Sequence, residues 1–256
     1  MKALILAAGY GVRLCPFTKS VPKPLLDVNG RPILEYILKR IEAIPEIEEI
    51  YMVVNNKFHE KFEEWNRSYE SEKPIRLIND GTTDNSNKLG AIRDIELVIR
   101  EGQIDSDLLV IAGDNIFNFD LKKICDFWEQ NNSFCVGLFK INDLSLVCQY
   151  SNVKLDSENR IIDFVEKPPK ALSNLIAICL YIFPRKGLHM VEKYLEEGNN
   201  PDAPGYFVQW LIKREKVYGY EFGGKWLDVG DIHSYEEAKE EFHFKNFLMK
   251  ERLNDE

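Results

Sequence analysis

The sequence lacks the features that would place the protein in or across a membrane. No apolar run approaches the roughly 18 residues that a membrane-spanning helix needs. The first apolar segment begins at Met1, without the charged leader and cleavage site of a signal peptide. We therefore expect a cytoplasmic protein that has no membrane partner.

Cysteine is scarce and unpaired in spacing, and histidine is rarer still. The chain has five cysteines, an odd number, and none is arranged as Cys-X-X-Cys. Because most of them lie in apolar runs, we expect buried reduced thiols rather than disulfides or a metal site. The four histidines show no metal-ligand spacing, and we interpret them as structural: His59, His189, His233 and His243.

Basic residues are fewer than acidic residues. Lysine and arginine total 33 against 42 acidic residues, which gives a formal net charge of -9, and the basic residues are scattered singly. Duplex nucleic acid is bound by a dense basic face, so we expect no nucleic-acid partner. A local positive pocket for a small anionic molecule remains compatible with this composition.

The 256 residues, 45% of them apolar, suffice for one large domain or a compact pair at ~150 residues per domain. The first part alternates strand and helix patterns, which predicts an α/β fold with a mostly parallel sheet covered by helices on both faces. In such a sheet, ligands bind at the carboxyl ends of the strands. Strands are expected at 1–8, 50–56, 75–79 and 108–112, and helices at 31–41, 57–66 and 89–100.

After about residue 145 the pattern changes to antiparallel pieces. Residues 153–155 and 161–165 flank a polar turn and predict a hairpin, and 176–183 predict another strand. A helix that contains Leu188, Val191 and Leu195 follows, and then a breaker-rich loop at 198–205. The end of the chain predicts a charged amphipathic helix over 235–253. Its apolar side packs on its own chain or meets another subunit: Phe242, Phe244, Phe247 and Leu248.

Two glycines follow the first strand in the segment from Leu6 to Leu14. Gly9 and Gly11 leave backbone amides open to an anion, although a plain strand-to-helix turn is an equal reading of the pair alone. Leu14 occupies the third-glycine position and no Gly-Lys-Ser/Thr follows, so this is neither a dinucleotide fingerprint nor a P-loop. Arg13 and Lys23, the latter held between two prolines, favour the anion-binding reading.

Three charged motifs stand at strand ends. Asp114 follows a buried strand, and Asp228 lies in an apolar, glycine-bounded segment. Each is a natural Mg²⁺ ligand or, equally, a loop cap, and spacing alone does not show that the two meet. The Glu166-Lys167-Pro168 motif either protects an exposed edge or presents a lysine to a phosphate and a carboxylate to hydroxyl groups.

Taken together, these segments resemble a known enzyme family. LAAGYGVRLCPFTKSVPKPLLDVNGRPILEY, AGDN, EKP and WLDVGD, in this order, are similar to the sugar-1-phosphate nucleotidylyltransferases, the family of glucose-1-phosphate thymidylyltransferase and its uridylyl and cytidylyl relatives. The resemblance implies a Rossmann-like nucleotidyltransferase fold, a Mg²⁺ cofactor, and the reaction of a nucleoside triphosphate with a sugar 1-phosphate to give a nucleotide sugar and pyrophosphate. It also implies one domain over 1–256, with a nucleotide-binding part (1–145), a sugar-phosphate-binding part (146–233) and a C-terminal helix (234–256).

The resemblance assigns roles to residues by motif. Catalysis falls to Arg13, Lys23 and Asp114, and the metal to Asp114 and Asp228. The nucleotide-binding residues would be Leu6, Ala8, Gly9, Gly11, Arg13, Lys23, Asn79 and Lys88. The sugar-phosphate-binding residues would be Asn115, Tyr150, Glu166 and Lys167.

The sequence departs from the family where specificity is set. The glutamine that usually contacts the base is missing from 78–91, and Cys179 replaces a usual glycine near the sugar. The Asn115-Ile116-Phe117 continuation most resembles the thymidylyl branch of the family, and dTTP or UTP is the expected nucleotide. The alternatives are a CTP-dependent enzyme for an alcohol phosphate such as phosphocholine, and a non-catalytic sugar-nucleotide sensor. A homo-oligomer is left open.

Overall fold

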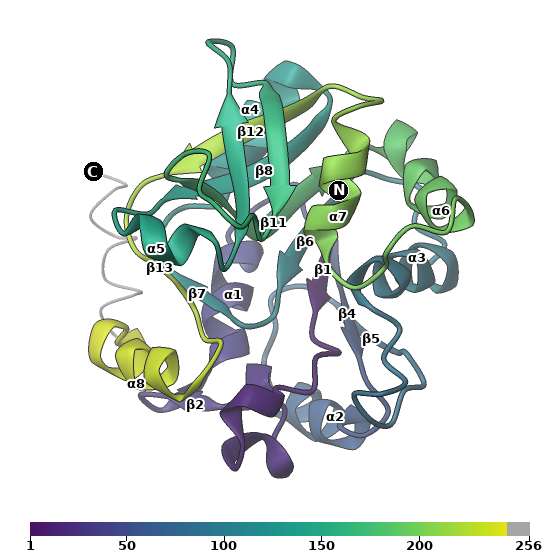
Figure 1. Ribbon diagram of the computed structural model, residues 1–256. Coiled ribbons are helices and arrows are strands. Elements are labelled where there is room, and N and C mark those ends of the chain that lie inside the picture. The colour runs from purple at the N-terminus through teal and green to yellow at the C-terminus, as the bar shows by residue number, and fades with distance from the viewer. Residues whose placement is uncertain (245–256) are drawn as a thin grey trace.

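The computed structural model describes residues 1–244, and a twisted sheet forms its centre (Figure 1). In this part of the chain the sheet has nine strands, in the order β10-β9-β11-β6-β1-β4-β5, with β8 joined to β11 and β12 joined to β8. The strands are β1 (Lys2–Leu6), β4 (Glu49–Val54), β5 (Ile75–Asn79), β6 (Leu108–Ala112), β8 (Phe134–Lys140), β9 (Ser151–Leu155), β10 (Ile161–Glu166), β11 (Leu175–Phe183) and β12 (Val217–Phe222).

The middle of the sheet is parallel because its strands are connected through helices. β1 pairs in parallel with β4 and β6, and β4 pairs in parallel with β5. β11 runs antiparallel to β6, β8 and β9. Two small ribbons lie outside this sheet: β2 (Asp27–Val28) with β3 (Arg31–Pro32), and β7 (Asn115–Phe117) with β13 (Trp226–Asp228).

Helices cover both faces of the sheet. Along β1, Ala3 and Ile5 belong to one hydrophobic cluster and Leu4 to the other, as the alternation of a strand buried on both faces requires. The first cluster includes residues of α1, α2, α4 and α8, and the second includes residues of α3, α6 and α7. The helices are α1 (Ile33–Glu42), α2 (His59–Ser68), α3 (Ala91–Glu101), α4 (Lys122–Asn131), α5 (Leu144–Val147), α6 (His189–Glu196), α7 (Pro204–Leu211) and α8 (Ile232–Glu241).

The α/β fold expected from the sequence is confirmed, and several boundaries change. The expected strands at 75–79 and 108–112 match β5 and β6, and the hairpin matches β9 and β10. The loop expected at 198–205 ends earlier, because Pro204 begins α7. The C-terminal helix begins at Ile232, where Asp231 forms a capping box, and α8 ends at Glu241. Residues 245–256 of the expected helix lie outside the described range.

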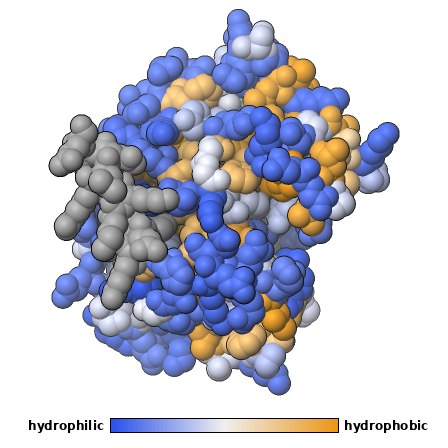
Figure 2. Space-filling view, turned by 90° about the vertical axis from the view of Figure 1, so that its left-hand side faces the viewer, coloured by the Kyte–Doolittle hydropathy of each residue, from blue (hydrophilic) through white to orange (hydrophobic). Residues whose placement is uncertain are grey.

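The exterior agrees with the charged composition. The face shown in Figure 2, which is the side of Figure 1 that carries α8, is largely hydrophilic with scattered apolar patches. Within residues 1–244, no helix is both long and apolar enough to span a membrane. All five cysteines are free, but only Cys125 and Cys135 are buried, and Cys15 is exposed, which corrects the expectation of buried thiols.

Candidate functional site

The carboxyl ends of the central parallel strands meet at one edge of the sheet. The loop after β6 packs directly on the end of β1, since the Gly113 amide donates to the Leu6 carbonyl at 2.9 Å. A side chain at position 113 would place its Cβ 2.8 Å from that carbonyl oxygen, so this approach requires glycine. The segments that carry Gly9 and Asp114 therefore lie side by side.

Three connected hollows open at this edge. The main cleft, about 380 Å³, extends from Asp114 and Asp228 to Lys88. The cradle, about 220 Å³, is lined by Gly9, Gly11, Arg13, Lys23, Asp114 and other residues. The side pocket, about 230 Å³, is lined by Arg13, Tyr150, Glu166, Lys167, Asp228 and other residues. Asp114 is shared by the main cleft and the cradle, and Asp228 by the main cleft and the side pocket, so these acids stand at the junction.

The cradle depends on a glycine that its local structure requires. Gly11 has a φ of 59°, and the Thr18 hydroxyl donates to its carbonyl at 2.8 Å. A Cβ at position 11 would lie 2.9 Å from the Thr18 side chain, in addition to the strain of the left-handed conformation. A Cβ at Gly9, in contrast, would meet nothing within 4 Å, so its backbone faces open space.

Two acids from distant parts of the chain converge on one lysine. The Lys23 ammonium lies 2.6 Å from an Asp114 carboxylate oxygen and 3.6 Å from one of Asp228. The β13–β7 ribbon causes this meeting, because it aligns Asp228 with Asn115 and lets the Val229 amide donate to the Asp114 carbonyl at 3.0 Å. Lys23 is only 8% exposed, so its charge is balanced mainly by these carboxylates.

The electrostatics of this junction favour a cation. Burial and the Asp114 charge raise the pKa of Asp228 to about 6, while Lys23 and Arg13 act in the opposite direction. The described residues contain no cluster of three or more histidine, cysteine or acidic side chains that would enclose a metal ion. Two carboxylates without a protein cage suit Mg²⁺, which takes its other ligands from water and substrate phosphates.

The side pocket is built on a hydrogen-bonded acid. The Ser151 hydroxyl donates to the Glu166 carboxylate, and Gly205 of α7 packs so closely on both side chains that a Cβ there would overlap Glu166. The Lys167 amide donates to the Tyr150 carbonyl at 3.2 Å. The Tyr150 ring packs edge-on against Trp226, with their centroids 5.4 Å apart. Glu166 is therefore fixed beside a cation in a pocket with an aromatic wall.

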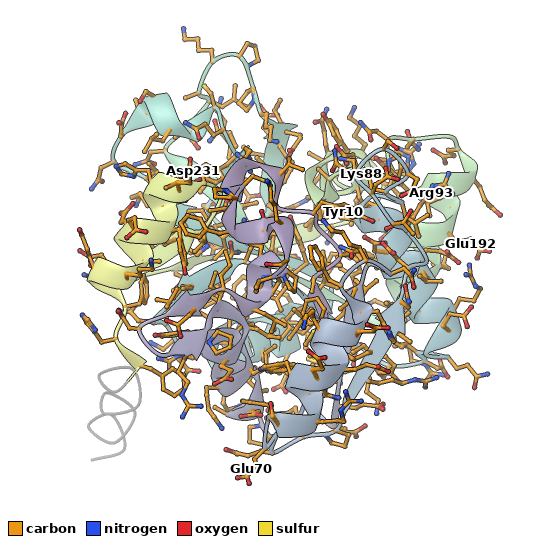
Figure 3. All side chains as sticks on the ribbon, turned by 90° about the horizontal axis from the view of Figure 1, so that it is seen from below. Tyr10, Glu70, Lys88, Arg93, Glu192 and Asp231 are labelled. Atoms are coloured by element: carbon orange, nitrogen blue, oxygen red, sulfur yellow. The ribbon has the colours of Figure 1, made fainter. Side chains whose placement is uncertain are left out.

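The far end of the main cleft is lined by polar side chains from α3 and the loop before it. Asp80, Lys88 and Asp94 lie here with Tyr10, whose hydroxyl is 2.7 Å from that of Thr82. Seen from below, Tyr10 and Lys88 lie on one side of the molecule, and Asp231, which lines the side pocket, lies on the other (Figure 3).

The structure brings most of the residues expected from the sequence to these hollows. Leu6, Ala8, Gly9, Lys88, Asp114, Asn115, Tyr150 and Asp228 line the main cleft. Asn115 also has a structural contact, because its side-chain amide donates to the Ile178 carbonyl at 2.6 Å. Asn79 is not among the lining residues, since its side chain contacts Asn56 and the Gly81 amide.

Two acids at the site were not expected from the sequence. Asp80 faces the cleft next to Asn79, and Asp94 lies at the start of α3 between the buried Ile92 and Ile95. An acid flanked by core residues of a helix was the available signal for Asp94. Cys179, expected in place of a glycine near the sugar, lines both the main cleft and the side pocket with a φ of 52°.

Comparisons with known proteins identify the family of this chain. The family model described as nucleotidyl transferase matches residues 2–244. The bifunctional protein GlmU of Methanocaldococcus jannaschii is 31% identical over 230 residues, which cover 90% of this chain and 51% of that protein. Mannose-1-phosphate guanyltransferase of Saccharomyces cerevisiae is 29% identical over 234 residues, which cover 90% of this chain and 61% of that protein. The chain thus spans about half to three fifths of these relatives.

Solved structures share the fold. A crystal structure of UDP-glucose pyrophosphorylase with UDP-glucose superposes with a TM-score of 0.78, at 22% identity, and covers 93% of this chain and 97% of that chain. The apo form of a UDP-glucose pyrophosphorylase gives a TM-score of 0.80 at 21% identity, with coverage of 96% and 99%. At these identities the likeness concerns the fold alone.

Proposed function

Because this chain belongs to the nucleotidyl transferase family, we propose that its site transfers a nucleotidyl group from a nucleoside triphosphate to a sugar 1-phosphate. The observation that carries this proposal is the convergence of Asp114 and Asp228 on Lys23, where the three hollows meet. A triphosphate, a base with its ribose, and an acceptor phosphate each require a separate compartment around one reacting phosphorus atom. The cradle, the main cleft and the side pocket supply these compartments.

The cradle suits the triphosphate. The backbone at Gly9 is open to an oligophosphate, and Arg13 and Lys23 bring two positive charges to it. In the reaction an oxygen of the acceptor phosphate attacks the α-phosphorus, a new P–O bond forms, and the bond to the β-phosphate breaks. The electron pair leaves with pyrophosphate, whose charge Arg13 and Lys23 stabilise.

No general base is needed for this step. The attacking phosphate oxygen is already anionic at neutral pH, so the protein has to align the reactants and neutralise charge. Within residues 1–244, the side chains that line the three hollows include no histidine.

We assign the Mg²⁺ ligands to Asp114 and Asp228. The position of the Lys23 ammonium beside both acids supports this assignment, because the pair faces a positive charge there. Within residues 1–244 no further histidine, cysteine or acid completes a metal cage, which leaves ligand positions for phosphate oxygens. When bound, Mg²⁺ supplies charge stabilisation at the α-phosphate.

The side pocket suits the acceptor. Lys167 would hold its phosphate, and Glu166, already accepting from Ser151, would accept hydrogen bonds from sugar hydroxyls. Cys179 fills space on the wall shared with the main cleft, which favours a compact acceptor. On that observation, an alcohol phosphate such as phosphocholine, with CTP, is the second candidate.

The deciding experiment measures pyrophosphate release with Mg²⁺ for each nucleoside triphosphate, dTTP included, against a panel of sugar 1-phosphates and phosphocholine. Release with one sugar 1-phosphate and a mass spectrum of the nucleotide sugar would support the proposal. Release only with phosphocholine would favour the second candidate. Tight nucleotide binding without release from any pair, in a folded sample, would contradict both and indicate a sensor.

A further inference from the structure

Asp94 is a buried acid at the far end of the main cleft, and one of its carboxyl oxygens has no partner among the described residues. It lies in the first turn of α3 and is 7% exposed. Its Oδ1 atom is fully buried, and within the described residues no hydrogen-bond partner reaches it. Burial, with a smaller effect of Asp80, raises the pKa of this carboxyl to about 7. Buried polar atoms in native proteins are nearly always satisfied, so an unpaired carboxylate that lines a cleft indicates a missing ligand.

The Asp94 side chain does not cap the N-terminus of α3. A carboxylate at the start of a helix often caps free amides, but here the loop before α7 does so. The Ala91 amide donates to the Asp202 carbonyl at 3.2 Å, and the Ile92 amide to the Pro201 carbonyl at 2.9 Å. The Asp94 amide itself donates to the Gly90 carbonyl at 3.0 Å. The side chain of Asp94 is therefore not required for the helix end.

Asp80, the neighbouring acid, is already engaged. Its carboxylate accepts from the Thr82 amide at 2.7 Å and from the Thr82 hydroxyl at 2.8 Å and 2.9 Å. Thr82 is in turn held by the Tyr10 hydroxyl. Thr82 therefore holds Asp80 in place, whereas Asp94 has a carboxyl oxygen that no donor of residues 1–244 reaches.

The position of Asp94 in the main cleft indicates which part of a bound nucleotide would face it. This step rests on the proposed function: with the triphosphate in the cradle beside Lys23, the base extends along the main cleft toward Lys88 and Asp94. Thymine and uracil present one N–H flanked by two carbonyl oxygens, and those oxygens are repelled by a carboxylate. Cytosine, adenine and guanine each present an exocyclic amino group that donates hydrogen bonds.

We propose that Asp94 selects a nucleotide whose base carries an exocyclic amino group, against dTTP and UTP. This selection differs from the dTTP or UTP that the Asn115-Ile116-Phe117 resemblance favours. A site built to pair a polar group rejects the analogue that lacks the partner, because its own buried group then stays unsatisfied.

The test compares kcat/KM for CTP, GTP and ATP with those for dTTP and UTP at pH 8, where a carboxyl with a pKa of about 7 is mostly ionised, using Mg²⁺ and the best acceptor. We expect at least a tenfold preference for one amino-bearing base. Asp94→Asn should reduce that preference at least tenfold, because the amide can also donate to a carbonyl oxygen of thymine or uracil. Glu96→Gln is the control, since Glu96 lies on the same helix and pairs with Arg100 outside the cleft.

Nucleotide binding without acceptor, measured by calorimetry, separates the two proposals. Selective binding of an amino-bearing base without pyrophosphate release would leave this inference standing and overturn the proposed function. Best turnover with dTTP or UTP would overturn the inference and leave the proposed function standing. An equal loss with all nucleotides in folded Asp94→Asn would also overturn it, because that result assigns Asp94 to the ribose or to the structure.

Discussion

The ammonium of Lys23 lies 2.6 Å from the carboxylate of Asp114, although 91 residues separate them in the sequence. Asp228 lies 3.6 Å from the same ammonium. Three charged groups from three separate segments thus meet: the β13–β7 ribbon brings the two acids together, and the Lys23 ammonium offsets the repulsion between them. Because these groups lie so close together, removing the charge of any one of them changes the electrostatic balance of the junction.

Asp114→Asn tests this junction. We expect kcat to fall by about 100-fold or more, since the substitution removes the charge of one of the two proposed Mg²⁺ ligands and so weakens charge stabilisation at the α-phosphate. The fold should persist, because Lys23 keeps Asp228 as a partner. Steady-state pyrophosphate release and thermal unfolding check the two expectations. Asp105→Asn is the control, since Asp105 is exposed and pairs with Arg185. Full activity in Asp114→Asn would remove Asp114 from the reacting centre.

Gly9→Ala tests whether the cradle holds a triphosphate. An added methyl group would meet no protein atom within 4 Å, so the melting temperature should stay unchanged. The methyl group would occupy the space where a phosphate approaches the backbone, and KM for the nucleotide should rise about tenfold or more. Gly223→Ala is the matched control, because a methyl group there also meets no protein atom. Equal nucleotide KM values in both variants would contradict the assignment.

Gly205→Ala tests the side pocket. Its Cβ would overlap the Glu166 carboxylate and the Ser151 hydroxyl, which are ends of side chains that can move. We expect Glu166 to be displaced, so KM for the acceptor rises severalfold while KM for the nucleotide changes little. Gly9→Ala should give the opposite pattern. A rise confined to the nucleotide KM in Gly205→Ala would show that the acceptor binds elsewhere.

Asp94→Asn should stabilise the ligand-free protein at high pH. The pKa of Asp94 is about 7 in the folded state against an ordinary value of 3.8, so the ionised form destabilises the fold increasingly as pH rises through this interval. A difference of three pKa units corresponds to about 4 kcal/mol. The gain in unfolding free energy should approach this value at pH 8 and be less than half as large at pH 5.

Urea unfolding at pH 5 and pH 8 measures that gain, with Glu96→Gln as a reference that alters an exposed helix pair. Comparison of the two pH values cancels contributions that do not titrate. An equal gain at both values would mean that Asp94 titrates normally in the folded protein.

The regular part of the fold follows from local patterns. β5 and β6 were predicted at their observed bounds, because short apolar runs ending in polar or small residues are typical of buried parallel strands. α4 and β8 were not predicted, since their apolar residues are interrupted and their pairing with distant strands decides their structure. Cys15 was misjudged for a similar reason: its exposure depends on the turn around it.

The candidate site likewise contains residues that the sequence marks and residues that only the fold reveals. Gly9, Lys23 and Asp114 stand out locally, because glycine, proline and strand ends mark the backbone around them. That Asp228 joins Asp114 depends on the β13–β7 ribbon, which no spacing in the sequence reveals. In the sequence, Asp94 is indistinguishable from any acid on a helix. Only the fold shows that it lines the main cleft and that its Oδ1 atom has no partner among the described residues.

The β13–β7 ribbon also makes one strand of the junction dispensable for the sheet but not for the acid pair. A fragment that ends before Trp226 contains β1, β4, β5 and β6 of the parallel sheet together with Asp114, but it lacks Asp228. Under the proposed function, such a fragment would keep Gly9, Arg13 and Lys23 for the triphosphate without a complete pair of acids, so it would not turn nucleotide over.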